Sequence, residues 1–197
     1  MNNNGMIVTV VVVLLIIGGV ILAASYSSKN EMMNSTTTTA TTTTQEGVMV
    51  GGALMIPSRD IIDNAAMASN VTTVVAAVKA AGLVDTLKSA GPFTVFAPNN
   101  AAFTKLPAGT VETLLKPENK AQLVKILAYH VVVGRYTSAD LKDGQMLKTV
   151  EGQTIKIGKS ADGKITVNGT AMVETADVIS RNGVTFVIDT VLMPSAK

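Results

Sequence analysis

The amino-acid sequence predicts an α+β domain whose first half is helical and whose second half is rich in strands. Three observations lead to this prediction. Apolar residues recur at helical spacing between Asp60 and Leu127, and from Met146 onward they alternate with a period of two. A single early strand, Phe93 to Phe96, interrupts the helical half, so it has to join the later sheet.

The first helices have recognisable beginnings and ends. Helical patterning begins at Asp60, restarts after Asn70 and ends at Gly82, a residue type that favours the left-handed conformation after a helix. Another short helical turn is expected over residues 83–87. The apolar stretch from Gly47 to Pro57 is too short to span a bilayer, and we expect it to lie along the domain.

The early strand is followed by a second set of helices. Pro98 ends the strand, and Asn99 or Asn100 is placed to cap the next helix. Pro117 suits the first position of a further helix, because its missing N–H would have no partner there. That helix ends at the pair Tyr129-His130.

Turn residues divide the second half into strands. Asp162-Gly163, Asn168-Gly169 and Asn182-Gly183 are dipeptides that favour tight hairpin turns. Alternating apolar residues such as Ile155 and Ile157 lie between them. The pattern predicts a series of antiparallel strands that ends in a buried strand after Asn182-Gly183.

Three segments together resemble the fasciclin-like domain. Residues 91–103 (Gly-Pro-Phe-Thr-Val-Phe-Ala-Pro-Asn-Asn-Ala-Ala-Phe) and 182–194 (Asn-Gly-Val-Thr-Phe-Val-Ile-Asp-Thr-Val-Leu-Met-Pro) are similar to its two sequence boxes, and Tyr129-His130 matches its central Tyr-His pair. The resemblance runs from roughly Gly47 to Pro194. It implies a helical half packed on a mostly antiparallel sheet, or wedge, formed by the second half.

The resemblance also bears on particular residues. In the family, the region around the Tyr-His pair is linked to adhesion through cell-surface receptors, which makes Tyr129 and His130 candidate partner-binding residues. Many relatives carry His before the Val-Ile-Asp of the second box, whereas this chain has Phe186, so no role of that His transfers. Buried polar groups need hydrogen bonds. We therefore expect His130 to fix the helix-to-strand junction and Asp189 to accept bonds from groups near Thr94.

Composition limits the classes of protein and of site. At 197 residues the chain has room for one domain plus appendages. The absence of cysteine excludes disulfides, thiol catalysis and thiolate metal sites. A net charge of +2, with lysines spread singly, argues against a nucleic-acid partner.

The amino-terminal residues predict a membrane segment. After a short tail of residues 1–5, residues 6–24 contain no charge and match the ~20 residues that cross a bilayer as a helix. The length of this segment and the leader Asn2-Asn3-Asn4 favour a retained signal anchor over a cleaved signal peptide. The alternative is secretion after cleavage near Ser25. Gly18-Gly19 could let two anchors approach closely, in a weak homo-association, but glycine is common in membrane helices, and that explanation is favoured.

Residues 25–46 are rich in threonine and predict a flexible stalk between the membrane segment and a domain at residues 47–197. Asn34, Asn70 and Asn168 each begin an N-glycosylation acceptor pattern. Asn70 is equally well explained as a helix cap and Asn168 as part of a hairpin turn. Asn34, on the stalk, is the best candidate of the three.

No catalytic, metal or cofactor site is expected. His130 is the only histidine, and no serine lies in a Gly-x-Ser-x-Gly setting. Asp60 with Asp63 and Asp140 with Asp143 lack further ligands and are expected to serve helix caps and turns. A hydrolase built on His130 is the weakest hypothesis.

The sequence therefore predicts a non-enzymatic adhesion or envelope protein. A single-pass anchor would present one fasciclin-like domain on the extracellular or periplasmic side, where it would bind a cell-surface or matrix protein. The alternative, prompted by the aliphatic composition and by similar proteins that bind such molecules, is a secreted carrier of a small apolar ligand.

Overall fold

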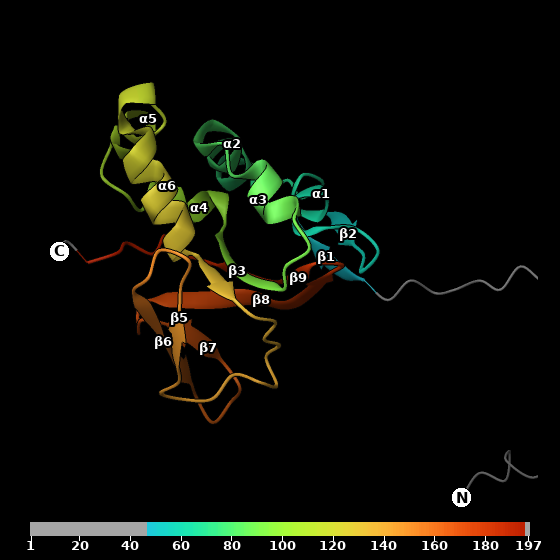
Figure 1. Cartoon of the computed structure of the whole chain (residues 1–197). Helices are drawn as coiled ribbons and strands as arrows, with labels where there is room; N and C mark the ends of the chain where they lie inside the picture. Colours follow the sequence, from blue (N-terminus) through green and yellow to red (C-terminus); the bar gives the residue numbers. More distant parts are fainter. Residues whose placement is uncertain (1–46, 196–197) are drawn as a thin grey trace, which may run out of the picture. The chain divides into compact units, whose positions relative to one another are not determined.

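The computed structural model of the chain describes residues 47–195. Within them, helices form one layer and strands form a second, as predicted for an α+β domain (Figure 1). No helix of this part of the chain is long and apolar enough to cross a bilayer. The predicted membrane segment, residues 6–24, and the stalk, residues 25–46, lie outside the described residues.

The helical layer is built from short helices. Asp60 caps the first helix, because its carboxylate accepts a hydrogen bond from the N–H of Asp63 at 2.8 Å. Gly82 ends the second helix in the left-handed conformation, with a φ of 75°. The helices are α1 (Ile61–Ala65), α2 (Thr72–Ala81), α3 (Val84–Lys88), α4 (Asn100–Thr104), α5 (Thr110–Leu114), the 3-10 helix η1 (Pro117–Asn119) and α6 (Lys120–Tyr129).

The main sheet has seven strands in the order β4-β3-β9-β8-β7-β6-β5. The early strand joins it as predicted, because β3 pairs in parallel with β9, and every other pair is antiparallel. The strands are β3 (Phe93–Pro98), β4 (Val131–Val133), β5 (Met146–Lys148), β6 (Thr154–Lys159), β7 (Ile165–Val167), β8 (Ala171–Ser180) and β9 (Gly183–Ile188). β3 continues past the predicted end at Phe96 and includes Pro98, the residue that was expected to stop it, as its last residue.

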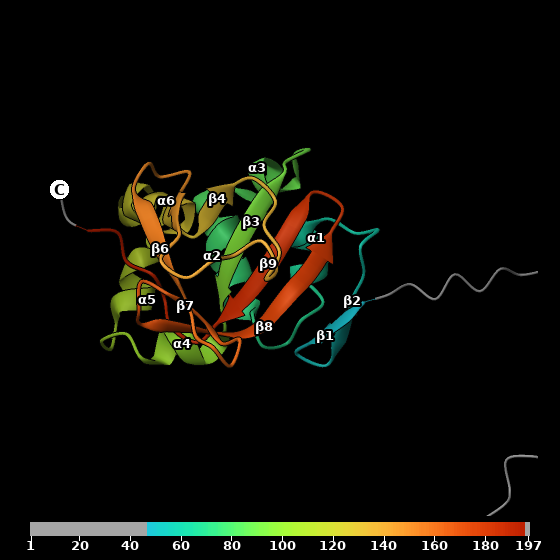
Figure 2. The ribbon, with the colours of Figure 1, turned by 90° about the horizontal axis from the view of Figure 1, so that it is seen from below.

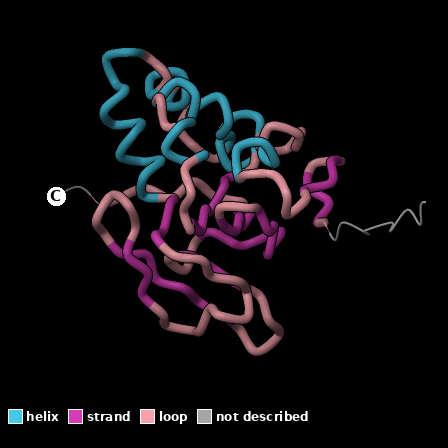
Figure 3. The backbone as a smooth tube through the Cα atoms, turned by 45° about the vertical axis from the view of Figure 1, so that its right-hand side comes forward, coloured by secondary structure: helices cyan, strands magenta, loops and turns pink. Residues whose placement is uncertain are grey.

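The two edges of this sheet meet. Val132 of β4 forms an antiparallel bridge with Thr149, which directly follows β5. The N–H of Val150 also donates to the carbonyl of Val131 at 2.7 Å. The sheet therefore curls into a nearly closed barrel, on the side of the domain away from the helices (Figures 1 and 3). We call this contact between β4 and the end of β5 the seam.

β3 and β9 lie between two apolar cores, side by side in Figure 2. Alternate residues of β3 face opposite sides, so that Val95 and Ala97 pack with the helices and Phe96 packs inside the barrel. Inside the barrel, the rings of Phe96 and Phe186 stack with their centroids 5.4 Å apart. Phe186 is fully buried, and this apolar surrounding suits phenylalanine better than histidine.

A separate two-stranded hairpin precedes the helices. It consists of β1 (Val48–Val50) and β2 (Ala53–Met55), joined by a turn at Gly51-Gly52. Val50 and Met55 are buried in the core beneath the helices. The stretch from Gly47 to Pro57 thus lies along the domain as predicted, and the hairpin was not foreseen.

Candidate functional site

His130 lies at the end of α6 and is buried at 3% exposure. Its Nε2 accepts a hydrogen bond from the N–H of Leu192 at 3.0 Å. Because that N–H can only donate, the ring proton is on Nδ1, which donates to the carbonyl of Ile126 at 2.8 Å. His130 therefore joins the end of α6 to the segment after β9, which agrees with its predicted role at the junction.

Burial fixes the charge of this ring. Removal from water disfavours the imidazolium and lowers the pKa of His130 from 6.5 to about 4, although the hydrogen bond to Ile126 acts in the other direction. A second ring proton would also face the N–H of Leu192. The ring is consequently neutral at physiological pH.

Tyr129 enters the barrel core, whereas its neighbour His130 borders the helical layer. The phenol is buried, and its Oη accepts a hydrogen bond from Nδ2 of Asn168 at 3.0 Å. Tyr129 and His130 are thus adjacent in the chain, but their side chains pack on different sides of the sheet. Both side chains hold the fold together in this structure, and a direct contact with a partner stays a prediction.

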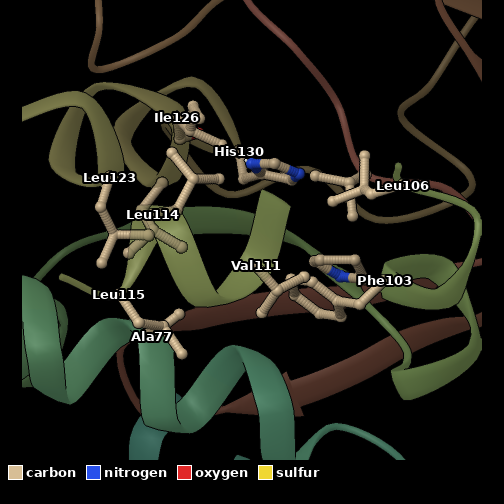
Figure 4. A pocket seen from close by; sticks show the side chains of 12 residues that line it. Ala77, Phe103, Leu106, Val111, Leu114, Leu115, Leu123, Ile126 and His130 are labelled. Atoms are coloured by element: carbon tan, nitrogen blue, oxygen red, sulfur yellow. Dashed lines mark hydrogen bonds between the residues drawn. The ribbon is translucent and has the colours of Figure 1, made fainter. Parts of the chain in front are cut away.

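An apolar pocket adjoins His130 between α2, α4, α5 and α6 (Figure 4). Figure 4 shows the imidazole near Leu106, with Val111 and Phe103 below it in this view. The free space is about 20 Å³, enough for roughly one water molecule. In full, the pocket is lined by Ala77, Pro98, Phe103, Leu106, Val111, Leu114, Leu115, Leu123, Ile126, Leu127, His130 and Val191.

Asp189 lies away from the predicted position near Thr94. Its carboxylate accepts hydrogen bonds from the backbone N–H of Met172 at 2.8 Å and from the hydroxyl of Thr190 at 3.0 Å, and it pairs with Lys105 at 2.9 Å. The prediction of backbone and hydroxyl donors is confirmed, but the location was wrong. The hydroxyl of Thr94 instead donates to the carbonyl of Gly134 at 2.8 Å.

The cap of α2 is also a correction. Val71 occupies the N-cap position, without a side-chain bond, so Asn70 does not cap this helix. Asn100 does so from outside, because its Oδ1 accepts a hydrogen bond from the N–H of Thr73 at 3.0 Å. Asn99 caps its own helix, α4, through a bond from the N–H of Ala102 at 2.7 Å. The two adjacent asparagines therefore cap two different helices.

The three N-glycosylation acceptor patterns differ in their surroundings. Asn168 is exposed in the turn between β7 and β8, and its Nδ2, the atom to which a glycan would be attached, donates to Tyr129. Asn70 is half-buried, and its Oδ1 is enclosed without a hydrogen-bond partner. Asn34 lies outside the described residues. Glycosylation at these three positions stays a prediction.

The aspartates singled out in the sequence serve the backbone. Asp60 caps α1, and its carboxylate lies 3.5 Å from Lys88. Asp140 accepts a hydrogen bond from the N–H of Thr137 at 2.8 Å. Asp143 accepts one from the N–H of Lys159 at 2.9 Å. These contacts are the helix cap and turn roles that the spacing predicted.

Asn182 is a buried residue whose role the sequence did not reveal. Its Oδ1 accepts from the N–H of Ile61 at 3.0 Å, and its Nδ2 donates to the carbonyls of Leu87 at 2.7 Å and Ser89 at 2.9 Å. One amide thus joins α1 and α3 to the turn before β9. Its neighbour glycine suggested only a hairpin turn, and no local signal marks partners this distant in the chain.

Comparisons with known proteins agree with this architecture. The family model described as "Fasciclin domain" matches residues 69–194. Protein sll1483 of Synechocystis sp. is 53% identical over 135 residues, which cover 68% of this chain and 73% of that protein. Human periostin is 38% identical over 121 residues, which cover 61% of this chain and 14% of periostin.

A solved structure shares the fold. The FAS1 domain pair from the insect cell adhesion molecule fasciclin I is similar with a TM-score of 0.63 at 19% identity, covering 77% of this chain and 59% of that chain. The hairpin of β1 and β2 precedes the residues matched by the family model, although it contributes to the same core. The match of residues 69–194, together with the identity to sll1483, shows that this chain belongs to the fasciclin domain family.

Proposed function

We propose that this chain is a non-enzymatic surface protein that presents one fasciclin domain outside the cell for binding to a cell-surface or matrix protein. The observation that carries the proposal is membership of the fasciclin family, of which one structural neighbour is the domain pair of an insect cell adhesion molecule. Residues 6–24 would anchor the chain, and residues 25–46 would hold the domain away from the bilayer.

The surroundings of His130 support a non-enzymatic role. General acid–base catalysis needs a ring nitrogen that reaches the reacting group. Both ring nitrogens of His130 are bonded to backbone groups of the fold, and burial lowers its pKa to about 4. A proton-transfer role would require at least one of these bonds to break.

Anchoring would make weak contacts effective. A tethered domain meets a nearby partner at a raised effective concentration, so low affinity per contact still gives lasting attachment when several copies act together. Adhesion by this route needs an exposed binding surface and no cofactor.

Protease added to intact cells that produce the protein tests the location of the domain. We expect the domain to be digested on whole cells and the amino-terminal segment to remain in the membrane pellet after an alkaline carbonate wash. Protection on whole cells, with digestion only after lysis, would contradict the proposal. Attachment of these cells to a matrix-coated surface, compared with cells that lack the protein, then tests adhesion itself.

The apolar pocket beside His130 favours one second candidate, a secreted carrier of a small apolar ligand. The pocket wall is aliphatic and aromatic, which suits an apolar molecule. Its free space of about 20 Å³ would have to grow, for instance by movement of α5. Native mass spectrometry of the secreted protein distinguishes the two: a mature amino terminus near residue 26 and one bound lipid or pigment per chain favour the carrier.

A further inference from the structure

The outer face of the seam between β4 and β5 is an unusual part of the barrel surface. Val133, Met146 and Val150 are three large apolar side chains exposed there, at 63%, 56% and 47%. They belong to an open groove of about 420 Å³, far larger than the pocket beside His130. In full, the groove is lined by Val133, Tyr136, Met146, Leu147, Lys148, Thr149 and Val150.

The register of the strands sets how these side chains alternate. Val132 and Thr149 are paired and both point inward, so their neighbours Val133 and Lys148 lie opposite each other on the outside. On the other side of β5, Met146 is paired with Lys156 of β6. The outer face therefore places exposed Val133 and Met146 beside Lys148 and Lys156, while Thr154 of β6 lies opposite Lys148.

The two lysines of this face lie without an acidic partner in the part of the chain that the structure describes. Among the described residues, neither Lys148 nor Lys156 takes part in a salt bridge. The carboxylate of Glu151, which follows Val150, is largely buried and lies 3.6 Å from Lys125. The positive charge on this face is consequently available to a partner.

We propose that the seam is the contact surface for an extended acidic segment of a protein partner, in which the side chains that face the seam are alternately acidic and apolar. In an extended segment, every second side chain points the same way, which gives a narrow ridge able to follow the groove. Its apolar residues would cover Val133 and Met146, and its carboxylates would pair with Lys148 and Lys156. The inference rests on the proposed binding function and names the surface and the partner chemistry.

The backbone at the seam determines how such a segment would bind. Val150 and Val131 already share a hydrogen bond across the two strands, so the edges do not offer a free ladder for an added strand. Recognition would therefore depend on side chains, and its ionic part would weaken as salt screens Lys148 and Lys156. Salt dependence is a property that distinguishes this mode from the pairing of an added strand.

The test uses the full chain in nanodiscs of phosphatidylcholine and a fluorescein-labelled ten-residue peptide in which every second residue is alternately Glu and Val, with Ser between them. We expect saturable binding by fluorescence anisotropy, weaker at high salt, and none for the peptide in which Lys replaces Glu. The double variant Lys148→Glu/Lys156→Glu should lose at least tenfold in affinity. The matched control, Lys79→Glu/Lys116→Glu, makes the same charge change on exposed helical-layer residues and should change affinity less than twofold.

A second pair of variants tests the apolar part. Val133→Thr/Met146→Thr should weaken the peptide, whereas Met49→Thr, which removes a similarly exposed methionine from β1, should not. Circular dichroism melting confirms that each variant is folded. Equal losses of peptide affinity in the seam and control variants would overturn the assignment. So would seam variants that lose binding to phosphatidylserine vesicles while their affinity for the peptide is unchanged.

The adhesion assay separates this inference from the proposed function. If cells attach to the matrix-coated surface and the seam variants attach equally well, the seam is excluded as the contact surface while the adhesion proposal stands. If wild-type cells do not attach but the peptide still binds at the seam, the adhesion proposal fails instead.

Discussion

Two Asn-Gly dipeptides precede strands of the same sheet, and they serve the fold in different ways. Asn168 and Gly169 are both in the left-handed region, with φ of 54° and 69°, and both are exposed in the turn between β7 and β8. Asn182 and Gly183 have no such φ. Arg181 and Asn182 form the turn, and Gly183 is already the first residue of β9.

The difference shows that one dipeptide can be required for two separate physical reasons. In Asn168-Gly169 the backbone conformation matters, because few other residues adopt left-handed φ without strain. In Asn182-Gly183 the amide of Asn182 joins three backbone groups, and Gly183 leaves room for the neighbouring strand. Substitutions at the two places should therefore differ in size and in cause.

Gly183→Ala should have the largest effect. A Cβ at this position would collide with the backbone carbonyl oxygen of Phe93 and approach Cδ1 of Ile61 to 2.9 Å. Because β3 is buried between two cores, its backbone has little room to move, and we expect a loss of about 3 kcal/mol or more in the free energy of unfolding. Urea unfolding followed by circular dichroism measures it. A loss under about 1 kcal/mol would show that the backbone of β3 can shift to make room for the added methyl group.

Asn182→Ala should come next. The change leaves the N–H of Ile61 and the carbonyl of Leu87 buried without their partner, at about 1–3 kcal/mol for each unsatisfied group. We expect a total loss of about 3 kcal/mol in the same urea experiment. Asn168→Ala is the comparison, because Asn168 itself is exposed and the expected loss is only about 1 kcal/mol, from placing alanine at a φ of 54°. Similar losses for the two variants would contradict the different roles of the two asparagines.

His130, like Asn182, is a buried polar residue that joins distant segments of the chain. Unlike Asn182, it titrates. Its pKa is about 4 in the folded chain and 6.5 as the ordinary value, so the unfolded chain binds the proton first as pH falls. This contribution to stability is complete above pH 6.5 and is lost as pH decreases toward 4. The slope should reach about 1.4 kcal/mol per pH unit.

The measurement is urea unfolding of the wild type and of His130→Gln at pH 7, 6, 5 and 4.5. The variant cannot titrate at this position, so the difference between the two curves isolates the imidazole from the carboxylates. We expect that difference to change between pH 6.5 and 4, while the difference between wild type and Asn182→Ala stays constant. Parallel wild-type and His130→Gln curves would contradict the assigned burial of His130.

Much of this architecture was predictable because it depends on local signals. The helical periodicity, Gly82, and the caps Asp60 and Asn99 are each recognised within a few residues of chain. The pairing of β3 with the later sheet was also predictable, because a buried strand needs partners. The structural role of His130 followed from a polar residue at the end of an apolar helix.

The missed features depend on contacts between distant segments. Asn182 binds Ile61 across 121 positions of sequence, and Asn100 caps α2 across 27. Neither partnership leaves a periodic pattern. The hairpin of β1 and β2 was missed because its Gly51-Gly52 turn lies in a short apolar stretch without clear alternation. The seam appeared only when the two sheet edges met.

Gly169→Ala should have the smallest effect of these changes. Nothing lies within 4 Å of a Cβ at Gly169, so the cost comes from the φ of 69° alone, at about 1 kcal/mol. Gly169→Asn should cost less than Gly169→Ala, because asparagine tolerates the left-handed region better. Urea unfolding of both variants beside Gly183→Ala checks the order. If Gly169→Ala were as costly as Gly183→Ala, the nearness of β3 would not be what makes Gly183 the more sensitive of the two glycines.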